Sequence, residues 1–472
     1  MFAWTKHWPR VAIGCLLLFL TLLGWSGAHV WRLINADINP TVDNIAKLNQ
    51  LLADSQPVGD NAWDVYRDLL VNDLGLTTQG SIGARWHAFY SFTGSGDLLQ
   101  GAWADVDRSQ AIAQLKTYRD LFDKLDLAAR MPVFIKPYPH GGDALIGDQT
   151  PTKLTPAWSI LLPELGTLRR LEKLNAFEMR AAAETGDWDE VVRRFKSGLA
   201  LGKGLTNQGT IIENIVSVSI MAISTGELAR LLNEHNIPIK TDRALLNAID
   251  SLHFSARAIN HHLIDGEMLI AEDMIQWLYS DDGHGGGAFL PGPASTMIAT
   301  GVTSPTTFGE RLLNPLGALI ADRKTTTKAV HRFSDEVHQY IDTPVLQRAP
   351  HEVYMRTMLS NPSLVVMNMV TPVYTHAVRT TELIEEKLAA IRVMLLLEIH
   401  HSQTGAWPAT LAEAMDEQDR RDPVMGEPFI YRLTPGDPAG RPYELRLPAP
   451  DKSDAFTIVN PPREPLPMSG ED

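Results

Sequence analysis

The stretch that decides the fold runs from 168 to 205 and reads LRRLEKLNAFEMRAAAETGDWDEVVRRFKSGLALGKGL. Apolar residues recur at helical spacing on both sides of Gly186, which predicts one helix over 168–185 and a second over 187–205. Gly186 can end the first helix, and Trp188 can pack back against it. The second helix presents an apolar face of Val191, Val192, Phe195 and Leu199 and a wet face of Arg193, Arg194 and Lys196. The stretch therefore predicts a helical hairpin with one buried face.

The second half of this hairpin carries a family resemblance. Residues 186–195, GDWDEVVRRF, followed by 198–201, GLAL, resemble the turn and second helix of a tetratricopeptide repeat. The resemblance implies a helical hairpin of this type at 168–205. Tandem repeats are stable because neighbouring units stack, and no second copy occurs at a period of about 34 residues. A stacked superhelix is therefore not expected.

Helical spacing dominates the rest of the chain. It predicts helices over 41–52, 62–74, 109–127, 211–232, 242–278 (one helix or two), 325–341 and 378–402. The segment 211–232 is almost free of charge but too short in its apolar part to span a bilayer, so we expect a helix buried in the core. Proline and glycine predict long loops over 131–156 and 281–307. The fold class expected is mainly α, with an irregular α-helical body over 32–402.

The C-terminal segment, 403–472, differs in kind. It contains 405–411, GAWPATL, and alternating patterns that predict short strands over 443–447 and 456–459. This pattern resembles the C-terminal part of pseudopilin-like proteins and of uncharacterised bacterial proteins with a single membrane anchor, where a long helix leads into a small sheet. The resemblance implies a small α+β or β segment and no known activity. The N-terminus lacks the Gly-Phe processing site of a true pilin.

The N-terminus predicts a transmembrane signal-anchor. From Val11 to Trp31 the chain holds no Asp, Glu, Lys or Arg, and a helix of this length rises about 30 Å, the thickness of a bilayer's hydrocarbon core. Basic residues without acids precede it, which places 1–10 in the cytoplasm and the body outside. We expect a single-pass protein of a bacterial inner membrane, facing the periplasm or exterior. Cleavage after Ala28 is the alternative, and it also exports the body.

Composition limits the partners. The chain has 56 acidic and 42 basic residues and a net charge of −14. Without a run of Lys and Arg, this balance argues against nucleic acid and against an anionic lipid surface. The only cysteine, Cys15, lies inside the predicted anchor. The body therefore forms no disulfide within itself and no cysteine-ligated metal site.

Two groups of residues are candidates for a metal site. His261, His262 and Asp265 lie at helical spacing that allows a shared ligand. Acid-x-x-His pairs, which place a carboxylate and an imidazole on one helix face, occur at Glu398 with His401 and at Asp335 with His338. The alternative for each is a hydrated helix face whose histidines pair with nearby carboxylates. The common hydrolase and nucleotide-binding motifs are absent, and no cofactor is predicted.

An aromatic cluster is the candidate for a binding surface. Trp86, Phe89 and Tyr90 stand close together between glycines. Such rings are enriched at protein interfaces but are also common in cores. We expect a membrane-anchored envelope protein that contacts another protein or stabilises an assembly. A metal-assisted envelope enzyme and a pseudopilin-like or secretion-associated component are the alternatives.

Overall fold

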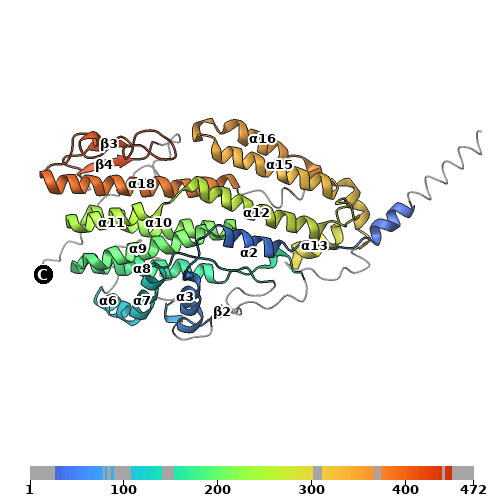
Figure 1. Cartoon of the computed structure of the whole chain (residues 1–472), viewed down its shortest axis with the longest axis horizontal. Coiled ribbons are helices and arrows are strands. Elements are labelled where there is room, and N and C mark those ends of the chain that lie inside the picture. The colour runs from blue at the N-terminus through green and yellow to red at the C-terminus, as the bar shows by residue number, and fades with distance from the viewer. Residues whose placement is uncertain are drawn as a thin grey trace, which may run out of the picture.

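The computed structural model describes residues 27–77, 80–81, 85, 87–89, 108–140, 154–300, 311–364, 367, 374–437 and 442–448. Over these residues the fold is mainly helical, and Figure 1 shows long helices lying side by side along an elongated body. Of the predicted anchor, residues 11–26 lie outside the described residues, whereas 27–34 form a helical segment. The strand expected over 456–459 also lies outside them.

The helices follow the predicted pattern closely. Their bounds are α2 (Asn44–Asp54), α3 (Ala62–Asp68), α6 (Arg108–Leu115), α7 (Arg119–Ala128), α8 (Glu164–Thr185), α9 (Trp188–Thr206), α10 (Ile211–Glu234), α11 (Ile239–Leu252), α12 (Ala256–Leu278), α13 (Pro291–Thr300), α15 (Arg323–Asp342), α16 (Ala349–Leu359) and α18 (Tyr374–Thr404). Shorter helical turns are η1 (Leu69–Asp73), η3 (Lys116–Tyr118), η4 (Ala157–Ser159), η5 (Asn314–Leu319), η6 (Val345–Gln347), η7 (Pro362–Leu364) and η8 (Leu411–Glu413). The strands are β1 (Leu76–Thr77), β2 (Gly80–Ser81), β3 (Ile430–Leu433) and β4 (Tyr443–Arg446).

The turn around Gly186 joins α8 to α9. Gly186 adopts a left-handed conformation, with φ at +73°, and the amide N–H of Asp187 donates to the carbonyl of Ala182 at 2.9 Å. The Asp187 side chain then accepts from the amide of Glu190 at 3.0 Å and caps α9. Glycine is required at this turn because residues with a Cβ rarely adopt the left-handed conformation.

One residue of the predicted wet face lies inside the protein. Arg194 is 1% exposed, so the expectation that it stays in water is wrong. Its guanidinium binds the Asp126 carboxylate on α7, and its Nε lies 3.0 Å from Glu190. Asp126 is 68 residues earlier in the chain. Because two carboxylates compensate the buried charge, Arg194 can tie α9 to α7.

Helix α10 runs through the middle of the body. Among the described residues it is the one helix whose length and composition would allow it to cross a bilayer, and 56% of its most apolar window is buried within the fold. It packs against α8, α9 and α18. The buried surroundings agree with the core helix expected over 211–232.

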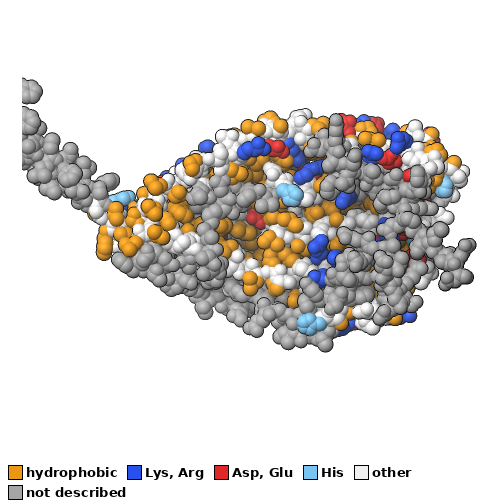
Figure 2. Space-filling model, turned by 180° about the vertical axis from the view of Figure 1, so that it is seen from behind, with side chains coloured by type: hydrophobic (Ala, Val, Ile, Leu, Met, Phe, Trp, Pro, Cys, Tyr) orange, Lys and Arg blue, Asp and Glu red, His pale blue; other side chains and the backbone are white. Residues whose placement is uncertain are grey.

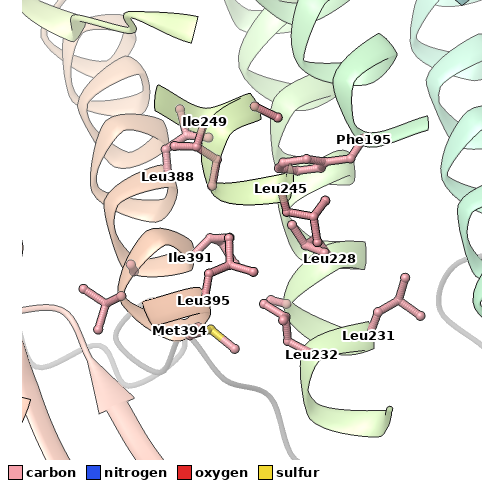
Figure 3. Close-up of a cluster of buried hydrophobic side chains, with 14 of the residues drawn as sticks. Phe195, Leu228, Leu231, Leu232, Leu245, Ile249, Leu388, Ile391, Met394 and Leu395 are labelled. Carbon is pink, nitrogen blue, oxygen red and sulfur yellow. The ribbon is translucent and has the colours of Figure 1, made fainter. Parts of the chain in front are cut away.

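The largest core cluster joins helices that are far apart in sequence. Figure 3 shows Phe195 of α9, Leu228 and Leu232 of α10, Leu245 of α11 and Leu395 of α18 pointing toward one another. These side chains are between 0% and 3% exposed. Burial of each such side chain contributes roughly 1.5–3 kcal/mol, so this cluster is a principal source of stability.

A buried carboxyl group sits between α8, α9 and α10. Glu172 accepts a hydrogen bond from the Ser224 hydroxyl and another, at 3.1 Å, from the Asn175 amide. A Cβ on Gly198 would lie 2.2 Å from the Ser224 Oγ, so glycine at 198 makes room for this contact. Burial raises the pKa of Glu172 to about 8. The group is therefore largely protonated at neutral pH.

We expect Glu172→Gln to remove a pH-dependent loss of stability. The unfolded carboxyl titrates near its ordinary pKa of 4.5, whereas the native one keeps its proton to about 8. The natural chain therefore loses stability as pH rises through this window, by about 1.4 kcal/mol per pH unit. Urea unfolding measures the free energy of unfolding of both chains at about pH 5.5 and about pH 7. Between these two pH values, the variant should gain about 2 kcal/mol relative to the natural chain. A difference that stays constant with pH would contradict this assignment.

The glycine- and proline-rich stretch contains one helix that was not expected. Within the predicted loop 281–307, residues Pro291–Thr300 form α13. Proline is tolerated in the first turn of a helix because its missing N–H would have no partner inside the helix there. The Ala294 amide still donates to the Leu290 carbonyl at 3.1 Å. The prediction of a loop from glycine and proline content was therefore wrong for residues 291–300.

The C-terminal segment folds onto the end of α18. Strands β3 and β4 form an antiparallel pair that brings Leu433 opposite Tyr443. Strand β4 corresponds to the predicted strand over 443–447, and β3 was not predicted. The Trp407 ring stacks on His401 with centroids 4.3 Å apart and also contacts Tyr443 at 5.0 Å. This packing attaches the small sheet to the largest core cluster.

Candidate functional site

A cleft of about 490 Å³ opens where α3, α7, α9 and α11 meet. Its lining residues are Ala62, Tyr66, Ala128, Ala129, Arg130, Met131, Pro132, Val133, Phe134, Lys196, Leu199, Ala200, Lys203, Gly204, Asn207, Ala248, Ser251 and Leu252. Along α9 the lining extends from Lys196 to Asn207, which corresponds to about 16 Å of helix at about 1.5 Å per residue. The cleft is thus long relative to its volume.

The wall of the cleft is held by hydrogen bonds to an extended segment. The Asn61 side chain, which also caps α3, donates to the Ile135 carbonyl at 2.8 Å and accepts from the Ile135 amide at 2.9 Å. A Cβ on Gly204 would lie 2.4 Å from the Phe134 ring. Glycine at 204 therefore lets the Phe134 ring approach α9 closely and form the apolar floor.

The lining is cationic in an acidic protein. It contains Arg130, Lys196 and Lys203, and no Asp or Glu is among the lining residues that the structure describes. The Lys203 ammonium donates to the Leu252 carbonyl at the end of α11. Burial lowers the pKa of Lys203, because removal from water disfavours the charged form. An anionic ligand in this cleft would meet positive charge above an apolar floor.

Behind the cleft wall lies a cluster of buried charges. Lys136 is 0% exposed, and its ammonium binds the Glu164 carboxylate and lies 2.6 Å from Glu213. The Tyr138 hydroxyl donates to Glu213, which also accepts from Thr210 at 2.6 Å. Burial alone would lower the pKa of Lys136, but the two carboxylates raise it. The cluster joins the loop after α7 to the first turns of α8 and α10 and is closed to solvent.

The first predicted metal group is only partly brought together. The His261 and His338 rings stack with centroids 4.8 Å apart, and their Nδ1 atoms are 2.5 Å apart. His261 Nε2 lies 2.7 Å from Asp342, and His338 Nε2 lies 3.3 Å from Asp265. A hydrogen bond between the rings needs one Nδ1 as donor and the other as acceptor, and this contact links α12 to α15. This geometry matches the alternative of histidines paired with nearby carboxylates.

The remaining metal candidates lie apart from this pair. His262 faces the other way, with Nε2 2.9 Å from the Asn207 carbonyl. The amide of Asn260, next to His261, lies 3.3 Å from the carbonyl of Val378 on α18. Glu398 and His401 are about 30 Å further along that helix, at about 1.5 Å per residue. Among the described residues, no group of three His, Cys, Asp or Glu side chains is placed to hold a metal ion.

The aromatic candidates are only partly within the described residues. Trp86 and Tyr90 lie outside them. Phe89 is 0% exposed and contacts the Tyr118 ring edge to face, with centroids 6.1 Å apart. Phe89 therefore lies in the core, which was the alternative to a role in a binding surface.

The cationic cleft was not predicted, although part of its signal is present in the sequence. Lys196 and Lys203 are seven positions apart on one predicted helix, which places them on the same face. Arg130 reaches the cleft from another element and has no such pattern. A scan against protein-family models and searches of curated proteins and of solved structures found no match for this chain.

Proposed function

We propose that this chain is a membrane-anchored protein of the bacterial envelope whose exported body binds an acidic segment of a partner protein. The cleft between α3, α7, α9 and α11 is the binding site. One observation carries the proposal: Arg130, Lys196 and Lys203 line the cleft, and its described lining contains no acid although the chain has a net charge of −14. Such contrast steers an anionic partner to one place.

The shape of the cleft supports a protein segment as the ligand. The 16 Å or so of α9 that line it would accommodate about five residues of extended chain at about 3.3 Å each. The floor of Tyr66, Phe134 and Leu199 offers apolar contact to alternate side chains. Helix α9, the second helix of the hairpin that resembles a tetratricopeptide unit, supplies the long wall.

The membrane part of the proposal rests on the charge-free segment 11–31 and on the basic residues before it. We propose that this segment is the single transmembrane anchor and that the body faces the periplasm or exterior. The small sheet formed by β3 and β4, with its pseudopilin-like sequence, is proposed as an appendage that stabilises the end of α18. No catalytic step is part of this proposal.

The cleft is tested by site-specific photo-crosslinking in intact cells. A photo-reactive residue at Ala200, in the cleft, should give one protein adduct, identified by mass spectrometry. The control is Lys240, which is on α11 but 87% exposed and about 16 Å along the helix from Ser251. A probe at position 240 should not give the same adduct.

Charge reversal then tests the chemistry. Arg130→Glu combined with Lys196→Glu should lower the adduct yield about tenfold, since each lost ion pair contributes about 1 kcal/mol or less. Arg130→Lys with Lys196→Arg should retain the yield. Equal adduct yields from the charge-reversed and natural chains would contradict the proposal. If position 200 gives no protein adduct and the cleft binds a small carboxylate, the ligand is a small molecule and not a segment of a partner protein.

A further inference from the structure

The end of the body where residue 27 begins carries an exposed apolar surface. Its members, the anchor-end patch, are Val30, Trp31, Leu312, Leu313, Leu316 and Leu319. Each is between 42% and 79% exposed. Figure 2 shows hydrophobic side chains gathered at this end of the molecule, beside the point where the N-terminal segment leaves. Contiguous apolar surface of this kind marks a contact with a partner or a membrane.

Two polar contacts hold the two parts of the patch together. The Asn314 side chain donates to the Leu33 carbonyl at 3.3 Å, and Arg311 lies 3.2 Å from Asp37. On the inner side of η5, a Cβ on Gly317 would lie 1.9 Å from the Phe289 carbonyl. Gly317 therefore faces the body, and the neighbouring Leu316 and Leu319 point outward. The leucines are fixed next to the segment that leads to the predicted anchor.

Sequence and position together identify what covers the patch. Val30 and Trp31 belong to the charge-free segment 11–31, so the patch continues the surface of the predicted anchor. The sequence from Gly283 to Gly309, which precedes η5, also contains no Asp, Glu, Lys or Arg. A tryptophan at the end of an apolar helix is typical of the boundary between headgroups and hydrocarbon. A second protein would have to share this surface with the bilayer that holds the anchor.

We infer that the anchor-end patch inserts into the headgroup boundary of the bilayer that holds the segment 11–31. The inference rests on the membrane attachment proposed above and is independent of the cleft. Apolar faces that bind in this way are buried about 5–10 Å into the boundary. Because β3 and β4 lie at the opposite end of the long axis in Figure 1, the body stands away from the membrane with this small sheet far from the bilayer.

Depth-dependent fluorescence quenching tests this placement on the full chain. Cys15 is the only cysteine, so Cys15→Ser provides a background for a single label. An environment-sensitive fluorophore is attached at Leu319→Cys and, as control, at Ile430→Cys, which is 54% exposed at the far end. In phosphatidylcholine vesicles containing lipids spin-labelled near the headgroup, we expect a loss of fluorescence at least about twofold greater at position 319 than at 430.

Each outcome separates the two proposals. Flotation with the vesicles reports the anchor, and quenching reports the patch. A chain that floats but is quenched equally at both positions would overturn the inference and leave the anchor intact. The inference would also be overturned if the labelled chain floats without lipid quenching and the unlabelled Leu319→Cys chain forms disulfide-linked dimers, because the patch would then face a second copy. A chain that does not float would overturn the attachment itself, and the inference with it.

Discussion

Lys136→Met is expected to lower the free energy of unfolding by about 3–5 kcal/mol, the typical result of breaking a buried ion pair from one side. Lys136, Glu164 and Glu213 are all 0% exposed. The variant would leave two buried carboxylates without their cation. Lys136 binds Glu164 Oε1, and Glu164 Oε2 has no hydrogen-bond partner among the described residues. The ammonium also lies 5.9 Å from the Trp63 ring and 5.7 Å from the Tyr138 ring, and these cation–π contacts would be lost as well.

A charge-neutral variant distinguishes the loss of the buried cation from a loss of packing. Lys136→Met combined with Glu164→Gln and Glu213→Gln removes all three charges and keeps the volume, so we expect it to recover more than half of the loss. Lys240→Met, at an ion pair with both side chains over 75% exposed, should change the free energy of unfolding by under about 1 kcal/mol. Urea unfolding of the full chain in mild detergent measures all of them. A loss below about 1 kcal/mol for Lys136→Met would show that the cluster is not a stabilising unit.

Hydrophobic periodicity was sufficient to find most of the helices. The expected helix over 325–341 is α15, Arg323–Asp342, and the one over 378–402 is α18, Tyr374–Thr404. Helix α15 has one buried face, so its apolar spacing survives in the sequence whatever packs against it. Helix α10 was predicted on other grounds, because its lack of charge indicated mostly buried surroundings.

Ion pairs between distant parts of the chain could not be predicted from hydrophobic periodicity. Arg194 was placed in water with Arg193 and Lys196, on the face opposite the apolar residues, but its partner Asp126 is on α7. Lys136 belongs to an irregular segment without any period, and its partners begin α8 and α10. An ion pair between distant elements depends on how the helices pack, and no local pattern reports it. The contact between His261 and His338 could not be predicted for the same reason, since the two residues meet only because α12 packs on α15.

Gly266→Ala is expected to lower the free energy of unfolding by about 3 kcal/mol, at the upper end of the usual range for overpacking. A Cβ at 266 would lie 2.2 Å from the Gly209 carbonyl oxygen and 2.7 Å from its Cα. Both neighbours are backbone atoms, so no side chain can rotate away. Gly209 is itself held by a hydrogen bond from its amide to the Tyr138 hydroxyl, at 3.1 Å. Helix α12 would have to move away from the α9–α10 junction.

That movement would also strain specific hydrogen bonds. The expected loss in the free energy of unfolding is therefore larger than the steric clash alone would cause. The Ile211 amide donates to Glu267 at 2.6 Å, and His262 Nε2 lies 2.9 Å from the Asn207 carbonyl. Both bonds join α12 to the residues that flank Gly209. Separation of the helices would leave the nearly buried Glu267, whose pKa burial raises to about 7, without this donor.

Gly226→Ala is the matched control and should act in the opposite direction. Gly226 lies in the interior of α10, and a Cβ there would meet no atom within 4 Å. Alanine restricts the unfolded chain and favours the helix, so we expect a gain of about 0.5–1 kcal/mol. Urea unfolding of both variants under one condition decides the matter, because a general intolerance of helix glycines to substitution would lower both values. Only a close backbone approach at Gly266 predicts that two glycine-to-alanine changes, each in the middle of a long helix, alter the free energy of unfolding in opposite directions.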